Sequence, residues 1–227
     1  SSTDSHLIKN SEWGAVAYLG QSKYGLNTTN IRINNVNESD YNKHVYAMTG
    51  YAAKNEEEGN KGSTTKENAC IWNQLDGTAA SCTGTIYGIY DMSGGTWERL
   101  AAIINNSANY SNGGNLNNYG KAIMNALNNG KSSEYVTVYD VSKSGDSGSN
   151  NWNANTKYGD AIRETSSGSE NKYSWYHDYS YFPTGGTSFF LRGGTYWDGE
   201  GAGLFYFNRH DGNSTYFNGF RSVLVAQ

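Results

Sequence analysis

The sequence contains one proline, two cysteines and few charged side chains. Lys, Arg, Asp and Glu make up 17% of its 227 residues, whereas soluble domains usually hold about a quarter. The formal net charge of −4 arises from 17 basic and 21 acidic residues dispersed along the chain. This balance excludes the basic surface that nucleic-acid binding requires, so we expect no nucleic-acid partner. The single proline, Pro183, disfavours a proline-rich stalk.

Long apolar runs are absent as well. A membrane-spanning helix needs about 20 apolar residues, and the longest apolar segments here, at 15–19 and 100–104, have the size of core segments. We therefore expect no direct membrane insertion. The first residue is Ser1 and no signal-like leader is visible, so we expect a processed chain or a fragment.

Aromatic residues are abundant: the chain holds 19 Tyr, 6 Trp and 7 Phe. A disordered chain carries far fewer, so this Asn-, Gly- and Ser-rich sequence is expected to fold. Its length could provide one large or two small domains. The polar segment 142–151 is too short and too closely flanked by aromatic residues to be an interdomain linker. We therefore expect 1–227 to form a single domain.

The spacing of apolar residues predicts an α+β fold. An N-cap signal at Ser11 precedes apolar residues at helical spacing and predicts a helix that stops before Gly25, while 116–128 predicts a second helix. Alternating or β-branched segments predict strands, and Ser93-Gly94-Gly95 predicts a turn between two of them. The expected strands cover 31–33, 45–50, 83–92, 96–104, 135–141, 189–194 and 223–225.

The two cysteines, Cys70 and Cys82, enclose a short segment with Asp76-Gly77 in its middle. In an oxidising compartment this spacing predicts a disulfide that closes a hairpin-like loop. The alternative is a pair of unrelated buried thiols.

The stretch from Leu191 to Val225 has two characters. At its ends, apolar segments meet glycines, as scaffold strands do. From Tyr196 to Asn218 the chain mixes Tyr, Asn, Ser, Thr, Gly, Asp, His and Arg, which is the composition of antibody-like binding loops. Long loops in compact domains are usually functional, which favours a binding role over a featureless polar loop.

Motifs for catalysis or cofactor binding are missing. The sequence has no Gly-rich loop ending in Lys-Ser/Thr, no His-Glu-x-x-His and no Cys-x-x-Cys. Two of the histidines precede an aspartate, which does not by itself make a catalytic dyad. We expect no catalytic residues, no cofactor and no metal, with calcium as an open alternative because Asp, Glu and Asn oxygens are plentiful. The histidines lie far apart in the sequence: His6, His44, His177 and His210.

Three further motifs carry a family resemblance. The segment 86–98 runs from Ile-Tyr-Gly-Ile-Tyr-Asp-Met to Ser-Gly-Gly-Thr-Trp-Glu. Near the C-terminus, Arg-Gly-Gly-Thr-Tyr-Trp at 192–197 is followed by Gly-Phe-Arg at 219–221, and Ala-Val-Ala-Tyr-Leu stands at 15–19. These motifs resemble signatures of the formylglycine-generating-enzyme (sulfatase-modifying factor) family. The resemblance implies a C-type-lectin-type fold of twisted antiparallel strands with two helices and long irregular loops.

The enzymes of that family resemble one another in placing a reactive cysteine pair between the Gly-Gly and Gly-Phe-Arg motifs. Here the interval from Thr195 to Asn218 contains no cysteine, and Cys70 and Cys82 lie far upstream. The iron-dependent sulfoxide-synthase branch would need an additional helical domain, which this length excludes. We therefore expect no enzymatic activity, and a formylglycine-generating-type oxidase is the less favoured alternative.

The chain looks most like the variable protein of a diversity-generating retroelement, a phage or bacterial protein whose C-terminal region is rewritten by adenine-directed mutagenesis. Template Asn codons then become many residue types, but not Trp, Glu, Lys, Gln or Met, so Trp197 and Glu200 would be fixed. The resemblance implies that the variable, ligand-binding residues are Tyr196, Asp198, Leu204, Tyr206, Asn208, Arg209, His210, Asp211, Asn213, Thr215, Tyr216, Phe217 and Asn218. The scaffold residues would be Arg192, Gly193, Gly194, Trp197, Gly219, Phe220 and Arg221, with the two aromatic ones buried.

This resemblance implies a surface-displayed, receptor-binding domain with 191–225 as its C-terminal variable region. Its partner would be a protein or glycan on another cell or surface, and its location extracellular, on a cell surface or on a virion. The main alternative is a calcium-dependent carbohydrate-binding lectin module.

Overall fold

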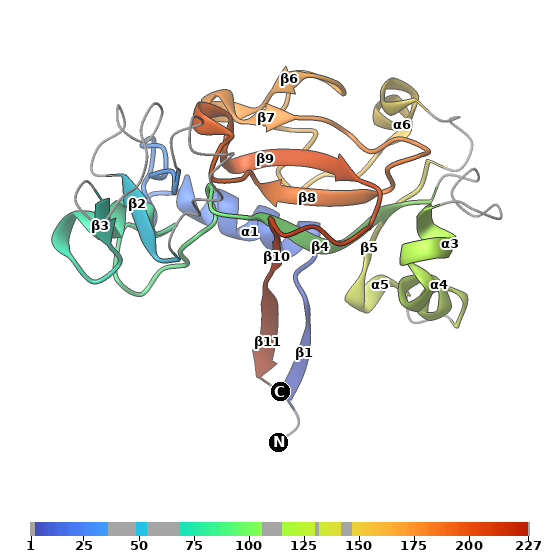
Figure 1. Cartoon of the computed structure of the whole chain (residues 1–227), viewed down its shortest axis with the longest axis horizontal. Helices are drawn as coiled ribbons and strands as arrows, with labels where there is room; N and C mark the ends of the chain where they lie inside the picture. Colours follow the sequence, from blue (N-terminus) through green and yellow to red (C-terminus); the bar gives the residue numbers. More distant parts are fainter. Residues whose placement is uncertain are drawn as a thin grey trace.

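The computed structural model describes residues 3–35, 49–53, 69–105, 115–129, 132–141 and 147–226. Its main sheet consists of β4 (Trp97–Ile104), β5 (Thr137–Tyr139), β6 (Lys172–Tyr173), β7 (Tyr179–Ser180), β8 (Phe189–Gly193), β9 (Gly203–His210) and β10 (Asn218–Phe220). The strands lie in the order β10-β4-β8-β9-β7-β6, and β5 pairs with β4 (Figure 1). The pairs β4–β8, β8–β9 and β6–β7 are antiparallel, whereas β10–β4, β4–β5 and β7–β9 are parallel. The predicted α+β class is confirmed, and the sheet is mixed rather than wholly antiparallel.

Helices lie at the margins of this sheet and behind it (Figure 1). None of the helices in the described part of the chain has the length and apolar composition needed to span a bilayer. The helices are α1 (Asn10–Gly20), α3 (Asn115–Tyr119), α4 (Lys121–Asn128), α5 (Ser132–Tyr135) and α6 (Gly148–Ala154), with 3₁₀ turns η2 (Leu75–Ala80), η4 (Trp175–His177) and η5 (Gly199–Gly201).

Helix α1 confirms the first predicted helix, but its N-cap is Lys9 rather than Ser11, which lies inside the helix. A capping box closes its N-terminus, because the Lys9 amide donates to Glu12 Oε2 at 2.9 Å. Trp13 on its inner side is fully buried. The helix ends at Gly20 rather than near Gly25 because the chain turns there: the Ser22 amide donates to the Leu19 carbonyl oxygen at 3.1 Å, and the Leu26 amide donates to the Gly20 carbonyl oxygen at 2.8 Å.

The second predicted helix is present but broken at Gly120. A Cβ at this position would lie 2.9 Å from the Leu116 carbonyl oxygen and 3.2 Å from Phe189 Cζ. Gly120 thus allows α3 to bring Leu116 against Phe189 in a small secondary core, and α4 begins directly after it.

Two predicted strands are wrong. Ile31 and Ile33 are buried, but no strand forms there, so their alternation reflects burial without ladder pairing. Residues 83–92 form turns, because the Thr83 and Thr85 hydroxyls bond each other at 2.9 Å and satisfy local polar groups that a strand would leave to its neighbour. The strand predicted at 45–50 lies mostly outside the described residues.

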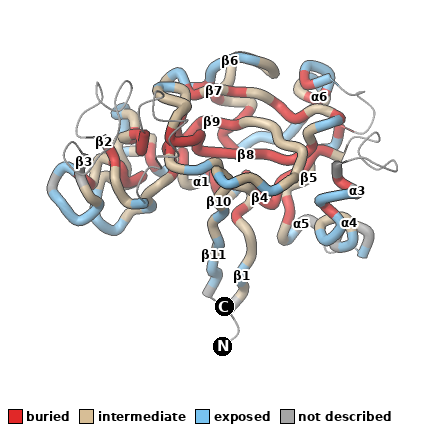
Figure 2. Tube along the Cα trace, in the orientation of Figure 1, coloured by how far each residue is buried: buried red, intermediate tan, exposed pale blue. Residues whose placement is uncertain are grey.

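The main core is aromatic and lies between α1, α6 and the inner face of the sheet. Figure 2 shows buried residues concentrated along β8 and β9. Tyr139 and Phe190 lie with ring centroids 4.6 Å apart, and Phe182 meets Phe190 edge to face at 5.4 Å. Such pairs add about 0.5–1.5 kcal/mol each beyond the apolar area that they bury.

A charged residue sits inside this core. The Arg192 side chain is completely buried and lies over the Trp13 ring, with its guanidinium carbon 5.6 Å from the ring centroid. Its Nη2 donates to the carbonyl oxygens of Ala161 and Leu204, each at 3.3 Å. Burial lowers the pKa of Arg192 to about 10, against the opposing attraction of buried carboxylates, foremost Asp160. The guanidinium therefore remains charged at neutral pH.

Two small sheets complete the fold. β1 (Thr3–Leu7) pairs with β11 (Ser222–Ala226) in an antiparallel ribbon that projects from the body, and both ends of the chain lie at its tip (Figure 1). β2 (Tyr51–Ala53) pairs with β3 (Ala69–Ile71) at the margin of the molecule away from α3 and α4 (Figure 1).

The structure corrects the predicted disulfide. Cys82 is a free, buried cysteine, and its Sγ accepts a hydrogen bond from the Ile89 amide at 3.2 Å. Burial raises the pKa of this thiol, which keeps it protonated. The backbone of Cys70 belongs to β3, and its side chain lies outside the described residues.

Replacing Arg192 by Met tests how the core depends on its buried cation. We expect Arg192→Met to lower the free energy of unfolding by about 3–5 kcal/mol, because it leaves buried carboxylates without their countercharge. Lys172→Met, at an exposed position of β6, is the charge-matched control and should change it by no more than about 0.5 kcal/mol. Equal urea midpoints for the two variants would contradict the role assigned to Arg192.

Candidate functional site

The strand register separates the two faces of the main sheet. Arg99, Leu191 and Asn208 are paired across β4, β8 and β9 and so share one face, which we call the outer face. Alternation along β9 adds Tyr206 to this outer face, whereas Phe207 belongs to the main core on the other side. The C-terminal half of β9 therefore faces the main core on one side, while on the other side Tyr206 is buried and Asn208 is partly exposed.

A hydrogen-bonded group of polar side chains covers the middle of the outer face. The Trp97 indole Nε1 donates to the Tyr206 hydroxyl at 2.9 Å and to Asp198 Oδ2 at 3.2 Å. Asn208 Nδ2 donates to the same Tyr206 hydroxyl at 3.0 Å. Asp198 Oδ2 also accepts from the Thr195 amide at 2.6 Å and hydroxyl at 2.9 Å. Trp97 thus ties the start of β4 to β9 and to the loop before it.

Burial dominates the electrostatics of this group. It raises the pKa of Tyr206 well above the usual value, so the phenol is neutral at all physiological pH values. Burial also raises the pKa of Asp198, while hydrogen bonds from Thr195 and Trp97 act in the opposite direction. These donors favour the ionised carboxylate.

Beside this group lies a cluster of aromatic rings. Trp97 meets Phe217 edge to face at 5.1 Å and Trp197 at 6.1 Å. Tyr216 packs against Phe217 at 4.6 Å and is 58% exposed. Phe220 of β10 is 72% exposed. The cluster presents amphipathic rings of the kind that dominate binding interfaces.

The loop 211–217, which follows β9, is anchored to the outer face. Arg99 Nη2 lies 3.3 Å from His210 Nδ1 and also donates to the Asn213 carbonyl oxygen. The Gly212 amide donates to His210 Nδ1 at 3.0 Å. Burial and the neighbouring Arg99 lower the pKa of His210, so its ring is neutral at pH 7 and accepts at Nδ1.

The residues expected to vary fall into two groups. Tyr216 is exposed, and the partly buried members are Asp198, Asn208, Arg209, His210, Asp211, Asn213, Thr215, Phe217 and Asn218. Tyr196, Leu204 and Tyr206 are at most 2% exposed. The expectation that Tyr196, Leu204 and Tyr206 contact ligand directly is therefore corrected: Leu204 belongs to the main core, both tyrosine rings are enclosed, and Tyr206 shapes the face from beneath.

Some of the expected scaffold residues are buried and others are exposed. Arg192, Gly193 and Gly194 are buried, as predicted. Trp197 is only partly buried, and Phe220 is largely exposed, which corrects the prediction that both are core. Phe220 is exposed because β10 lies at the edge of the sheet.

Sequence reasoning missed a hollow on the outer face beyond β9. Its volume is about 410 Å³, and it is lined by Tyr173, His177, Tyr179, Asp198, Glu200, Gly201, Tyr206 and Asn208. The His177 ring stacks on Tyr173 at 3.7 Å. The backbone φ angles of Tyr176 and His177, 60° and 76°, lie in a region that non-glycine residues rarely adopt. The Tyr-rich run at 173–182 was the signal that could have indicated this hollow.

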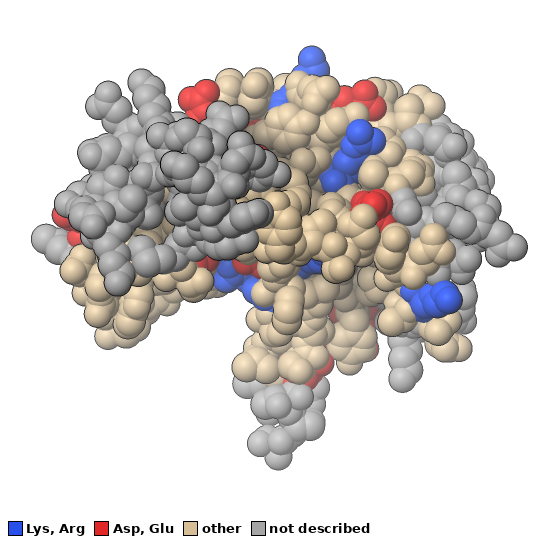
Figure 3. Space-filling model, viewed as in Figure 1, with Lys and Arg blue, Asp and Glu red and all other residues tan. Residues whose placement is uncertain are grey.

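Charge is sparse over the part of this surface that Figure 3 displays, where uncharged residues form most of the area over β8 and β9. Among the described residues, no group of three or more His, Cys, Asp and Glu side chains is arranged to hold a metal ion. The chain matches no protein-family model, no curated protein and no solved structure.

Truncating Tyr206 and Tyr216 separately tests the division between enclosed and exposed residues. Tyr206→Ala should destabilise the fold by about 3–5 kcal/mol, as expected for a buried aromatic ring. Tyr216→Ala should change the free energy of unfolding by no more than about 0.5 kcal/mol. Chemical denaturation of both variants checks this, and a Tyr206→Ala protein as stable as Tyr216→Ala would place Tyr206 on the surface.

Proposed function

We propose that this chain is the surface-displayed ligand-binding domain of a diversity-generating retroelement variable protein with a C-type-lectin-type fold. Its ligand, a protein or glycan on another cell or surface, would contact the outer face and the loop 211–217. The domain would act outside the cell, on a cell surface or on a virion, and would have no enzymatic activity.

The observation that carries the proposal is the position of the expected variable residues. Asn208 and His210 lie on the outer-face side of β9, and Asp211 to Phe217 form the adjoining loop. Two residues of β4, outside the variable region, hold the backbone of this loop: the Trp97 amide donates to the Phe217 carbonyl oxygen at 3.1 Å, and Arg99 Nη2 donates to the Asn213 carbonyl oxygen. Because these bonds end on backbone atoms, the loop side chains can change while the bonds remain.

The composition of this surface also supports a binding role. Tyr216 and Phe217 offer rings with few rotatable bonds, and Asn208 and Asp211 offer adaptable polar groups. Arg209 pairs with Phe190 and so lies on the opposite side of β9 from Asn208, where it lies over the Tyr181 ring at 4.0 Å and donates to the Thr184 hydroxyl at 3.0 Å. We therefore do not count Arg209 among the contacts of the outer face.

The chemistry of Cys82 argues against the oxidase alternative. A reactive cysteine is an accessible thiolate with a lowered pKa. The Cys82 thiol is buried, and burial raises its pKa.

A combinatorial library tests whether this surface tolerates variation and supports binding. We would randomise Asn208, Asp211, Asn213, Tyr216 and Phe217 to the residue types that adenine mutagenesis of Asn codons permits, and select displayed variants against lysozyme and streptavidin. Most members should fold, and the library should yield binders with Kd values on the order of micromolar or better.

The control is an equally diverse library on exposed positions in and after α1: Ala15, Leu19, Lys23, Tyr24 and Thr28. This control library should fold equally well and yield at least about tenfold fewer binders, because its positions lie outside the proposed binding surface. Equal yields from both libraries, or widespread unfolding of the first, would overturn the proposed function.

The source genome provides an independent test. We expect a near-copy of the codons for residues 195–218 next to a reverse-transcriptase gene, differing from the coding copy only at adenines. Sequencing the flanking DNA decides this, and flanks without such a copy would remove the retroelement part of the proposal while leaving the binding role to the library experiment.

A further inference from the structure

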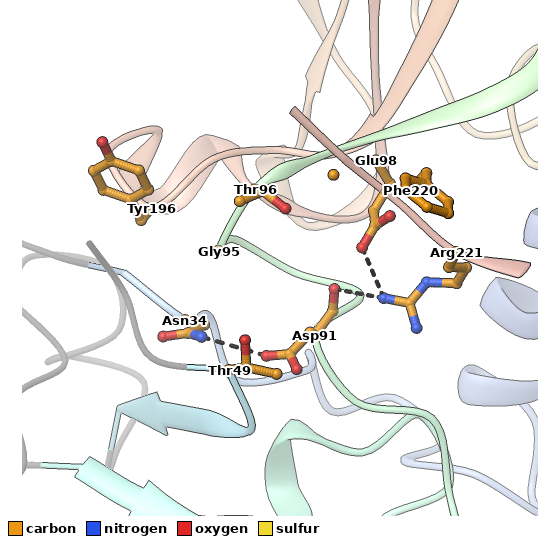
Figure 4. A pocket seen from close by; sticks show the side chains of 10 residues that line it. Asn34, Thr49, Asp91, Gly95, Thr96, Glu98, Tyr196, Phe220 and Arg221 are labelled. Atoms are coloured by element: carbon orange, nitrogen blue, oxygen red, sulfur yellow. Dashed lines mark hydrogen bonds and ion pairs between the residues drawn. The ribbon is translucent and has the colours of Figure 1, made fainter. Parts of the chain in front are cut away.

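A second cavity lies at the opposite end of β10 from the loop 211–217, and none of the residues expected to vary reaches it except Tyr196. Its volume is about 340 Å³. Figure 4 shows Glu98 and Arg221 pointing toward one another, with Asp91 on the neighbouring loop. The cavity is lined by these three residues together with Asn34, Thr49, Gly95, Thr96, Tyr196, Gly219 and Phe220.

Glu98 is the central group of this cavity. The residue is 6% exposed, and its Oε1 accepts a hydrogen bond from Arg221 Nη2 at 3.0 Å. Its Oε2 is buried and has no hydrogen-bond partner among the described residues. A buried carboxylate oxygen without a donor is unfavourable, so this atom is suited to accept one from a ligand.

Gly219 keeps the approach to Glu98 open. A Cβ at this position would lie 3.8 Å from Glu98 Oε2 and 2.5 Å from Thr96 Oγ1. Any side chain here would therefore fill space between the cavity and the carboxylate. The glycine of the Gly-Phe-Arg motif thus serves the cavity as well as the close packing of β10 on β4.

The charges around the cavity favour a cation. Asp91 and Glu98 contribute two negative charges, and the single positive charge of Arg221 is engaged by Glu98 Oε1 and by the Asp91 carbonyl oxygen, both at 3.0 Å. The Asp91 carboxylate accepts from the Gly50 amide, with both oxygens 2.9–3.0 Å from the nitrogen. With two carboxylates and one guanidinium, the lining of the cavity carries one net negative charge.

Phe220 supplies the remaining element. Phe220 also lines the cavity and is 72% exposed. An aromatic residue at the rim of a cavity that holds a carboxylate can add cation–π attraction to a charge-assisted hydrogen bond, the combination that binds ammonium groups. A cavity of this volume is large enough for the end of a lysine side chain.

We propose that the cavity between Glu98, Gly219 and Phe220 binds a lysine ammonium group of a protein ligand, with Glu98 Oε2 as the acceptor. This site does not depend on the variable surface: it would give the domain one constant contact beside a face whose other contacts change.

Butylammonium, as a fragment of lysine, provides the direct test. In a titration of the ¹⁵N-labelled full chain, the amide signals of Gly95, Gly219 and Phe220 should shift with a Kd on the order of millimolar. Methyl glucoside, a neutral polyol that stands for a glycan ligand, should not shift them at equal concentration. No shifts with butylammonium, or equal shifts with the glucoside, would refute the ammonium site.

Two variants locate the binding groups. Glu98→Gln keeps the shape and an acceptor for Arg221, and should weaken butylammonium binding at least about tenfold because the charge is lost. Glu134→Gln, at an exposed position of α5, changes the net charge equally and should leave the Kd unchanged. If Glu98→Gln binds as tightly as Glu134→Gln, Glu98 is not the acceptor.

Phe220→Ala keeps the test decisive if Glu98→Gln does not fold. Its exposed position carries little risk to the fold, and loss of the ring should weaken butylammonium binding about two- to fivefold. Unchanged affinity in Phe220→Ala would contradict the proposal. These fragment measurements do not use the randomised positions, so failure here and failure of the library are separate results.

Discussion

The buried guanidinium of Arg192 is the constraint on which the rest of this structure depends. Placing a cation in a core costs several kcal/mol unless countercharges and acceptors surround it. Here Asp160 and Asp178 supply negative charge, and the carbonyl oxygens of Ala161 and Leu204 accept from Nη2. These partners bring the segment before β6, the turn before β7 and the start of β9 to one strand, β8.

The same constraint explains the start of β9. Asp178 is buried, and its Oδ2 accepts from the Phe205 amide at 2.8 Å. A Cβ at Gly203 would lie 2.0 Å from that oxygen, so only glycine fits where β9 passes the carboxylate. Burial raises the pKa of Asp178 well above its usual value, while the Phe205 amide and Arg192 act in the opposite direction. The inner side of β9 is thereby held in place, and its outer side is free of this structural requirement.

Local signals in the sequence were sufficient for the elements whose contacts are local. The helix at Trp13 and the long strand at 97–104 were predicted because apolar spacing and capping residues lie within a few positions of each other. The segment 83–92 has the composition of a strand, yet its hydroxyl side chains bond locally and none of the described strands pairs with it. A segment forms a strand only when another strand pairs with it, and the sequence of one segment does not show whether such a partner is present.

In the candidate site, too, local features could be predicted from the sequence, whereas contacts between distant segments could not. Composition indicated a binding surface at 196–218, and the loop 211–217 with Tyr216 agrees with that prediction. Composition could not show that Tyr206 is enclosed, because the group that covers its hydroxyl, Trp97, lies 109 positions away. The pairing of Glu98 with Arg221 spans 123 positions, so the cavity beside Gly219 could not be predicted either.

The enclosure of Tyr206 changes what variation at this position would do. A residue whose hydroxyl accepts from both Trp97 and Asn208 does not offer that hydroxyl to a ligand. Replacing it would instead release the Trp97 indole and move the aromatic cluster that Trp97 forms with Phe217 and Trp197. If the proposed diversification is correct, changes at exposed positions such as Tyr216 alter individual contacts, whereas changes at Tyr206 alter the shape of the surface that carries them. A small number of varied positions could then produce both new contacts and new shapes on one backbone.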